Sequence, residues 1–475
     1  MNPVEIAVVS FTSLCVLVWV GHLMRMKIRL LGKLYLPSSV IAGLIGLLIV
    51  QCCRAGGAPL PEDITFVWGK LPGFLINIVF ACLFLGMAIP GVKTIWRHAG
   101  PQLAYGQIVA WGQYVVGIGL FLALITWMYP ELPAMFGGTL PVGFEGGHGT
   151  AGGMTKVFAD YNWPAGKDFA LACATAGIIS AVIVGMILVN WAARKGYTTR
   201  KQNPEDVPED DSIAVIPVDR RPEAGKLTIS SNALETLSFQ LAIVGIAIGL
   251  GWAGKHGLIG IGYAYGGIID FAIHMNLLAA DTYGHATVMQ LAESFPLFPL
   301  CMLGGLMVQV LANKFDSHKL IDHGLMKRLQ NTALDFLVVA AIATIRIEAI
   351  ADGLIPFAML VVAGIAWNVF CVMFLARRLL PDAWFERSIA EMGQSMGVTA
   401  TGLLLLRVVD PDYETPAADA FAYKQILHEP FMGGGLWTSA AIPFLAIWGG
   451  WPVLGIATGA VVIWIIVATL MKAKR

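Results

Sequence analysis

Charged residues are scarce in this chain. Only 13% of the 475 residues are Asp, Glu, Lys or Arg, against roughly a quarter in an ordinary soluble domain. The 31 basic and 31 acidic residues cancel, so no charge excess points to a nucleic-acid partner. The seven cysteines form no CxxC pair, and most stand alone in apolar runs, where a thiol behaves as a small hydrophobe. The composition therefore excludes a soluble protein and predicts no transition-metal site.

Motifs of common pumps and membrane enzymes are also missing. The chain has no GxxxxGK[ST] segment, which argues against an ATP-driven pump. It has no HExxH segment, and His148 has no second histidine near it in the glycine-rich segments to complete a zinc site. We therefore expect no catalytic residues and no organic cofactor. The alternative is a membrane-embedded enzyme that uses Glu145 and His148 as an acid/base pair.

Long apolar runs make up most of the chain. Charge-free runs such as Leu103 to Tyr129 and Leu354 to Ala376 exceed the roughly 18 residues that a helix needs to cross a bilayer. We therefore predict an all-α membrane protein with about eleven transmembrane helices. The predicted spans are residues 6–24, 34–53, 71–90, 103–129, 169–193, 237–253, 296–313, 332–351, 354–376, 431–448 and 452–471.

Basic residues predict how the chain is oriented. If the N-terminus faces outside, Arg25 and Lys27 fall on the cytoplasmic side, as do Arg377, Arg378 and the basic C-terminal tail. The positive-inside rule therefore places the N-terminus outside and the C-terminus in the cytoplasm. The polar, proline-containing residues 196–231 cannot bury a core and are predicted to be a cytoplasmic linker. Within residues 255–293, helical spacing from Ile268 to Leu278 predicts an interfacial amphipathic helix on the outer side.

Two glycine-rich segments interrupt the apolar pattern at equivalent places. They lie at about residues 137–158 and 388–410. Glycine lets the backbone leave the helix, unwound carbonyl groups can coordinate a cation, and free N–H groups at the start of a half-helix attract a carboxylate. The two segments enter the predicted topology from opposite faces, which is typical of inverted repeats. We predict two five-helix repeats, 1–195 and 232–448, each with a re-entrant loop, and an extra C-terminal helix and tail at 449–475.

The sequence motifs resemble those of one transporter family. Gly-Gly-His-Gly-Thr at 146–150 is followed by Lys-Val-Phe at 156–158 and Ala-Cys-Ala-Thr at 172–175, and Gly-Val-Thr-Ala-Thr follows at 397–401. With these motifs the chain resembles the glutamate:sodium symporter family over most of its length. The resemblance implies sodium-coupled symport of glutamate by an elevator-type movement, with sodium as the coupling ion. It also implies a homodimer in the lipid of a bacterial inner membrane.

Several positions depart from the pattern that the resemblance implies. Glu145 stands in place of a small polar residue, and Asp335 in place of a serine. Gln394 and Ser395 replace an aromatic residue and a glycine, and Arg346 replaces a lysine. A carboxylate beside an anion site repels the substrate unless it is protonated or holds a cation. The substrate is therefore glutamate, another amino acid or a dicarboxylate.

The glycine-rich segments supply most of the candidate site residues. The hydroxyl groups of threonines can join backbone carbonyls around a hard monovalent cation, and an arginine can clamp a carboxylate. The candidate substrate-binding residues are Gly146, Gly147, His148, Gly149, Arg346, Gln394, Ser395 and Gly397; the candidate ion-binding residues are Glu145, Thr150, Asp335, Val398, Thr399 and Thr401.

These assignments leave alternatives open. His148 binds substrate, carries a proton or only fixes its loop by a hydrogen bond. Glu145 lies either in the membrane interior or in an outer vestibule, and Arg346 either clamps substrate or extends to the membrane interface. The two glycine-rich segments also suit the filter of a channel.

Overall fold

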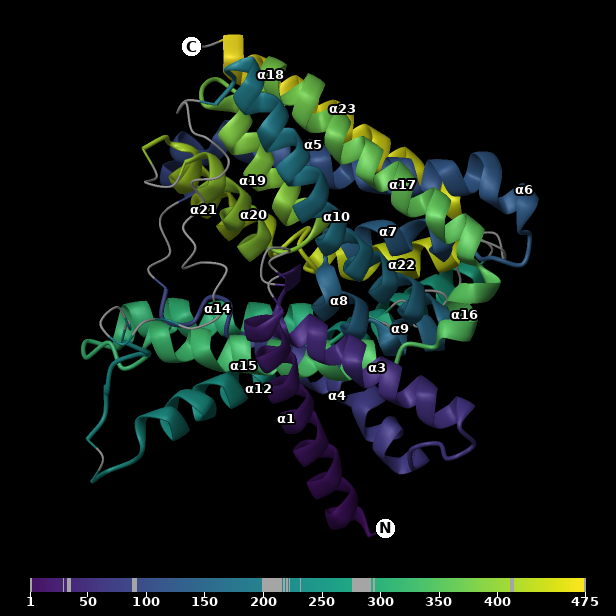
Figure 1. Ribbon diagram of the computed structural model, residues 1–475, viewed down its shortest axis with the longest axis vertical. Coiled ribbons are helices and arrows are strands. Elements are labelled where there is room, and N and C mark those ends of the chain that lie inside the picture. The colour runs from purple at the N-terminus through teal and green to yellow at the C-terminus, as the bar shows by residue number, and fades with distance from the viewer. Residues whose placement is uncertain are drawn as a thin grey trace.

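The computed structural model describes all residues except 1, 29, 32–35, 88–91, 199–215, 217, 219–220, 222, 231, 276–291, 294, 411–413 and 474–475. Every regular element within the described residues is a helix, as the sequence predicts (Figure 1). Most of the predicted linker, the end of the basic tail and residues 276–278 of the predicted amphipathic helix lie outside the described residues.

Nine helices in the described part of the chain are long and apolar enough to cross a membrane. They are Pro3–Lys27, Ser38–Ala55, Glu62–Ala81, Ala99–Met128, Ala165–Lys195, Thr236–Phe271, Phe298–Phe315, Leu354–Leu379 and Gly450–Met471. The third begins and ends earlier than the predicted span 71–90. The predicted total of about eleven stays a prediction.

The two remaining predicted spans are shorter or more polar. The predicted span 332–351 is divided into α15 (His323–Ala343) and α16 (Ile347–Asp352), and polar residues of α15 such as Lys327 and Asp335 lower its hydropathy. The predicted span 431–448 contains only the 13-residue α22 (Leu436–Trp448), because the glycines at 433–435 precede it.

The same order of elements occurs twice along the chain. In the first half, α5 (Val92–Leu120), the π-helix η1 (Phe121–Ile125) and α6 (Thr126–Met128) precede the interrupted pair α7 (Met135–Phe144) and α8 (Gly147–Gly153). In the second half, α17 (Leu354–Phe370), the π-helix η3 (Cys371–Leu375) and α18 (Ala376–Leu379) precede the interrupted pair α19 (Trp384–Met396) and α20 (Thr399–Val409). A π-helix at the same place in both halves strengthens the likeness between them, because π-helices are rare.

One later difference separates the halves. The first half continues with the short α9 (Thr155–Asp160) and the unbroken 31-residue α10 (Ala165–Lys195). The second half instead has α21 (Ala417–His428), a break and α22. The last helix, α23 (Gly450–Ala473), packs along α5.

The helices form two groups, which meet in a further hydrophobic cluster that contains residues of both. The first contains α1 (Pro3–Lys27), α3 (Ser38–Ala55), α4 (Glu62–Ala81), α12 (Thr236–His274), α14 (Phe298–Phe315) and α15, which share two hydrophobic clusters. The second contains α5, α7, α10, α17, α19, α20 and α21, which share another. Figure 1 shows the first group in the lower half of the molecule and the second above it, with the N- and C-termini at opposite ends.

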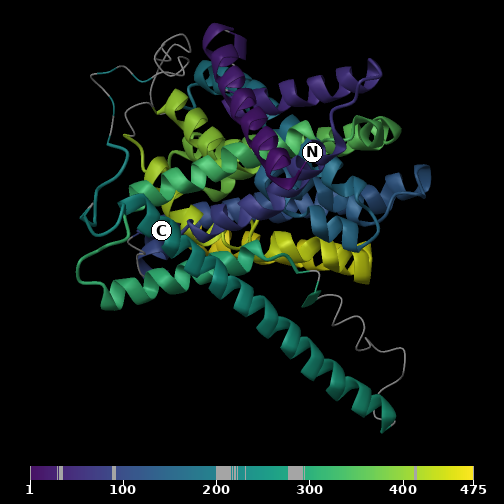
Figure 2. The same cartoon turned by 90° about the horizontal axis from the view of Figure 1, so that it is seen from below.

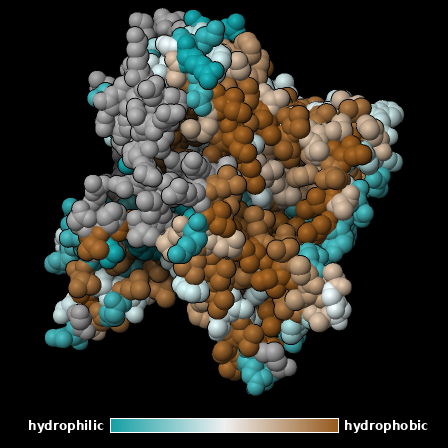
Figure 3. Space-filling model, in the orientation of Figure 1, coloured by the Kyte–Doolittle hydropathy of each residue, from teal (hydrophilic) through white to brown (hydrophobic). Residues whose placement is uncertain are grey.

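Small residues bring the helices of the first group together. A Cβ atom on Gly304 would overlap the carbonyl oxygen of Ala247 in α12, and one on Gly305 would overlap that of Ala81 in α4. Close backbone approach at small residues is a common way for helices to pack in membranes. Hydrophobic residues also cover much of the molecular surface that Figure 3 shows, as a surface in contact with lipid requires.

Helix α12 corrects one prediction. It continues as a single 39-residue helix to His274, so the segment predicted to start a separate amphipathic helix at Ile268 is the end of α12. No proline lies between Ala253 and His274 to end the helix. Figure 2 shows α12 extending away from the other helices.

Candidate functional site

The first interrupted pair turns at Glu145 and Gly146. Helix α7 is fully buried, and a Cβ atom on Gly143 would lie 2.5 Å from the carbonyl oxygen of Ala170, so α7 runs directly against α10. The backbone N–H groups of Glu145 and Gly146 both donate to Pro141, at 3.0 and 3.1 Å. Gly147 then takes a left-handed conformation (φ +67°), which glycine adopts without strain, and α8 begins.

The second interrupted pair turns at Gly397 and Val398. Val398 is extended (φ −144°, ψ 165°), and its carbonyl oxygen accepts from the N–H groups of Thr401 and Gly402 at the start of α20. A Cβ atom on Gly393 would lie only 2.7 Å from the Cα atom of Gly402, so α19 and α20 form a tightly closed hairpin.

The two turns lie next to each other. A Cβ atom placed on Gly147 would be 3.5 Å from Cγ1 of Val398 and 3.6 Å from the carbonyl oxygen of Gly397. Helices α8 and α20 both begin at this point, and neither has a side-chain cap for its first N–H groups. Two uncapped helix starts thus meet, each with free donors and the positive end of its dipole.

A third break of the chain reaches the same place. Residues 429–435 separate α21 from α22, and Gly434 (φ +86°) lies so close to the Thr150 side chain that no Cβ atom fits there. The sequence predicts the first two breaks but not this one.

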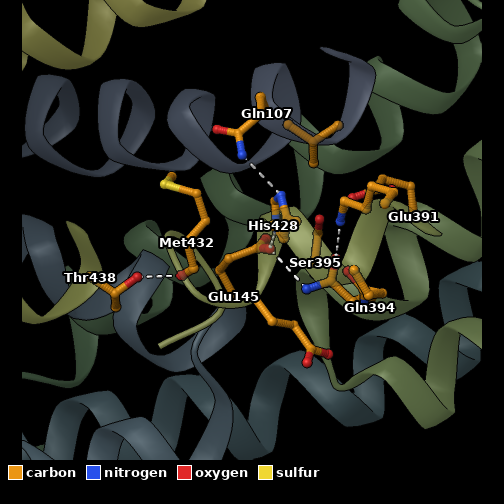
Figure 4. A network of polar contacts seen from close by, with 12 residues as sticks. Gln107, Glu145, Glu391, Gln394, Ser395, His428, Met432 and Thr438 are labelled. Carbon is orange, nitrogen blue, oxygen red and sulfur yellow. Dashed lines mark hydrogen bonds and ion pairs between the residues drawn. The ribbon is translucent and has the colours of Figure 1, made fainter. Parts of the chain in front are cut away.

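A buried carboxylate joins these elements (Figure 4). Glu145 is 5% exposed, and its Oε1 atom accepts from Nε2 of Gln394 in α19 at 2.9 Å. The same oxygen lies 2.6 Å from Nε2 of His428 in α21, whose side chain is fully buried. Glu145 is therefore held inside the protein, and an outer vestibule is wrong for it in this structure.

A buried ion pair extends the network. Lys424 Nζ lies 2.6 Å from Oε1 of Glu391 and donates to Oε1 of Gln394 at 2.9 Å, and the side chains of both charged residues are fully buried. The second oxygen of Glu391 accepts from Nε2 of Gln102 in α5 at 2.8 Å. Glu391 of α19 thereby connects α19 to α5 through Gln102 and to α21 through Lys424.

Thr399 is tied to the third break. Its hydroxyl group donates to Glu429 at 2.6 Å and accepts from Nε2 of Gln425 at 2.9 Å. Thr401 is buried and lies beside Gly397, where a Cβ atom would be 3.0 Å from its hydroxyl oxygen. The candidate threonines of both pairs thus lie at the turns, Thr150 against Gly434 and the other two around Gly397.

Three candidate residues contact other parts of the molecule. Arg346 pairs with the fully buried Asp168 of α10 at 2.8 Å, at the break between α15 and α16. Asp335 lies on an exposed position of α15 and forms a side-chain hydrogen bond with Ser39 of α3. His148 contacts the hydroxyl group of Thr175 in α10 at 2.9 Å, which fits its role as a fixing hydrogen-bonder of the loop.

Gly149 and Ser395 have packing neighbours. A Cβ atom on Gly149 would lie 3.3 Å from Ile76. Ser395 is fully buried, and its carbonyl oxygen accepts from Gln113 at 2.7 Å.

Residues 393–397 (GQSMG) have G-x-S-x-G spacing, but this serine lies within a helix rather than on the strand-to-helix turn that a hydrolase uses. His428 contacts Glu145 and Gln107, so neither ring nitrogen serves Ser395 as a base.

The polar face of α21 was not predicted from the sequence. Lys424, Gln425, His428 and Glu429 all take part in the network, and so does Glu391 of α19. Lys424 and His428 are four positions apart and share a helix face. Such a pair just before three consecutive glycines was the signal available in the sequence.

A family model for sodium/glutamate symporters matches residues 5–258. The chain belongs to this family. The match covers the first interrupted pair with Glu145, and it confirms the resemblance inferred from the motifs. No curated protein and no solved structure matches the chain. Family membership and the nine long apolar helices of the described residues make the chain an integral membrane protein.

Proposed function

We propose that this protein is a secondary active carrier that couples the movement of sodium to that of glutamate or a related small anionic amino acid or carboxylate. The observation that supports it most is the meeting of two uncapped helix starts at Gly147 and Val398. Converging N–H groups and helix dipoles favour a carboxylate there. The substrate-binding residues would be Gly146, Gly147, Gly149 and Gly397, with Gln394 beside them.

Sodium would bind among oxygen atoms next to this point. The donors that we propose are the hydroxyl groups of Thr150, Thr399 and Thr401 and the carbonyl oxygen of Val398, because a hard monovalent cation prefers neutral oxygen ligands of this kind in broken helices. Sodium at these oxygens would strengthen carboxylate binding by compensating its charge. Arg346 and Asp335 lie outside this proposed site, because Arg346 is paired with Asp168 and Asp335 lies on α15 with Ser39 of α3 as its partner.

The two groups of helices support an elevator-type movement. Both turns and α21 belong to the group around α5, α10 and α19, which could move as a unit along the group around α3, α4 and α15. We also propose the finer features expected from the sequence: inverted repeats at 1–195 and 232–448 with re-entrant loops, a homodimer, and a bacterial inner membrane with the C-terminus in the cytoplasm.

Uptake by reconstituted protein tests the proposed function. Proteoliposomes should accumulate labelled L-glutamate when an inward sodium gradient is imposed and should lose it when the gradient is dissipated. Unlabelled amino acids and dicarboxylates added in excess identify the preferred substrate. Sodium-driven uptake with which glutamate does not compete would reject glutamate and retain the carrier. No sodium-driven uptake of any anionic substrate would reject the proposal.

A further inference from the structure

One face of α5 forms the floor of a groove between α21 and α23. The groove has a volume of about 500 Å³, which is within the range of roughly 300–1,000 Å³ that small-molecule sites occupy. Leu103, Gln107 and Trp111 form the floor, because they are four positions apart and share one face of the helix. The sides are lined by Leu427 and Phe431 from the end of α21 and the break after it, and by Ala460, Ile463 and Trp464 of α23.

Helix α23 runs antiparallel to α5 along its length. Near the start of α23, a Cβ atom on Gly450 would lie 2.9 Å from the side chain of Leu122. Near its end, the side chain of Met471 would overlap a Cβ atom on Gly100. The groove is therefore the space that remains between α23 and α21, which both pack on α5.

The lining of the groove is apolar except at Gln107. The Oε1 atom of Gln107 accepts from Nε1 of Trp111 at 3.0 Å, and its Nε2 atom lies 3.3 Å from Nδ1 of His428 in α21 (Figure 4). Both polar atoms of this side chain are thus engaged within the protein. None of the lining residues that the structure describes is charged, so an ionic ligand would lose its hydration there without a counter-charge. The groove therefore suits a hydrocarbon ligand.

The mouth of the groove opens onto the surface that faces lipid. Phe431 and Ile463 are 40% and 60% exposed. Further exposed apolar residues continue this surface along α23; they are Ile456, Val462 and Ile466. Helix α23 is long and apolar enough to cross the membrane, so the side chains exposed on it face hydrocarbon. An acyl chain of a lipid can therefore enter the groove without passing through water.

The length of the floor fits a chain from one leaflet. Leu103 to Trp111 extends about 12 Å along α5 at 1.5 Å per residue. One leaflet contributes about 15 Å, half of the roughly 30 Å hydrocarbon core of a bilayer. The floor thus matches most of the depth that a single acyl chain covers.

We propose that the groove binds one acyl chain of a bilayer phospholipid as part of the packing between α5, α21 and α23. The chain would cover Gln107, which contacts His428, and Phe431 in the break between α21 and α22. Helix α23 then has a role of its own, because it completes the lipid site. The proposal does not depend on which substrate the carrier moves.

Native mass spectrometry of the full-length protein tests the site. After release from detergent micelles, the unaltered protein should retain one phospholipid per protomer. Ala460→Phe should lose this lipid, because the added ring would occupy the groove. Ala242→Phe is the matched control, since Ala242 is exposed on α12 and does not line the groove, and it should retain the lipid. Size-exclusion chromatography verifies that each variant is folded.

Photolabelling tests the unaltered protein and stays valid if Ala460→Phe does not fold. A phospholipid with a diazirine at the end of one acyl chain is added to the detergent-purified protein in equimolar amount. It should label residues 103–111 and 460–464 more strongly than the exposed residues of α12. Zwitterionic and anionic head groups on the same chains should label equally, because no charged residue is among those that line the groove.

Several results would overturn the proposal. They are retention of no phospholipid by the unaltered protein, full retention by folded Ala460→Phe, and labelling of 103–111 and 460–464 no stronger than that of α12. Bound detergent in place of phospholipid would also overturn it. So would a dimer that Ala460→Phe converts into monomers, because the groove would then be an interface between two copies of the chain.

Discussion

Lys424 carries a full positive charge in a completely buried position, balanced by Glu391 at 2.6 Å. Replacing it with methionine keeps most of the side-chain volume but leaves Glu391 as an unpaired buried carboxylate. Removing one partner of a buried pair costs about 3–5 kcal/mol. We expect Lys424→Met to lower the free energy of unfolding in detergent micelles by about that amount.

An exposed lysine supplies the control for this prediction. Lys156 pairs with Asp160 at 2.5 Å, and its side chain is 72% exposed, so Lys156→Met should cost less than about 1 kcal/mol. The double variant Lys424→Met with Glu391→Gln should recover part of the loss. Equal effects of the two lysine substitutions would show that the buried pair does not stabilise the fold.

Only part of the residue network could be predicted from the sequence. Glu145 stood out because a carboxylate among glycines and apolar residues is costly in a membrane. His428 and Lys424 lie in a segment of mixed polarity, Ala417–His428, that resembles an ordinary exposed helix. Their burial results from long-range packing against α5 and α19, which no local pattern of one sequence encodes.

At the scale of elements, the hairpin of α19 and α20 depends on Gly402. A Cβ atom there would overlap the carbonyl oxygen of Ala390 and would lie 3.0 Å from the Phe421 ring. Gly402→Val should therefore push the two helices apart, lower stability by about 1–3 kcal/mol and reduce uptake strongly. Thermal unfolding and proteoliposome uptake measure the two effects.

Gly459 in α23 is a matched position, because no described atom lies within 4 Å of a Cβ atom placed there. Gly459→Val should change stability by about 0.5 kcal/mol or less and leave uptake intact. Full uptake by Gly402→Val would contradict the tight hairpin.

Element boundaries were predictable where glycine and proline determine them. The turns at Glu145 and Gly397 fall inside the predicted segments 137–158 and 388–410. The break between α15 and α16 was not predicted, since no glycine or proline lies between Ala343 and Ile347. It is stabilised from outside the segment, by Asp168 of α10, which accepts from both the backbone N–H and the side chain of Arg346.

At the scale of the whole molecule, the proposed orientation can be measured on α10. Its 31 residues extend about 46 Å, more than the roughly 30 Å of a bilayer core. Asp160 should lie outside and Lys195 in the cytoplasm. For this measurement Cys15, Cys52 and Cys53 are first replaced by serine. The cysteines that remain are buried, so the introduced cysteine is the one that the reagent can reach.

Asp160→Cys in that background should react with a membrane-impermeant maleimide in intact cells. Lys195→Cys should react only after permeabilisation. The reverse labelling would invert the topology and place the N-terminus in the cytoplasm.

Carriers and channels differ most directly in counterflow. Liposomes containing the protein are loaded with unlabelled glutamate, with equal sodium on both sides, and diluted into a trace of labelled glutamate. A carrier whose broken helices form one alternating site predicts a saturable, sodium-dependent rise of internal label above the external concentration, followed by decay. Simple equilibration of the label without this overshoot would contradict the account.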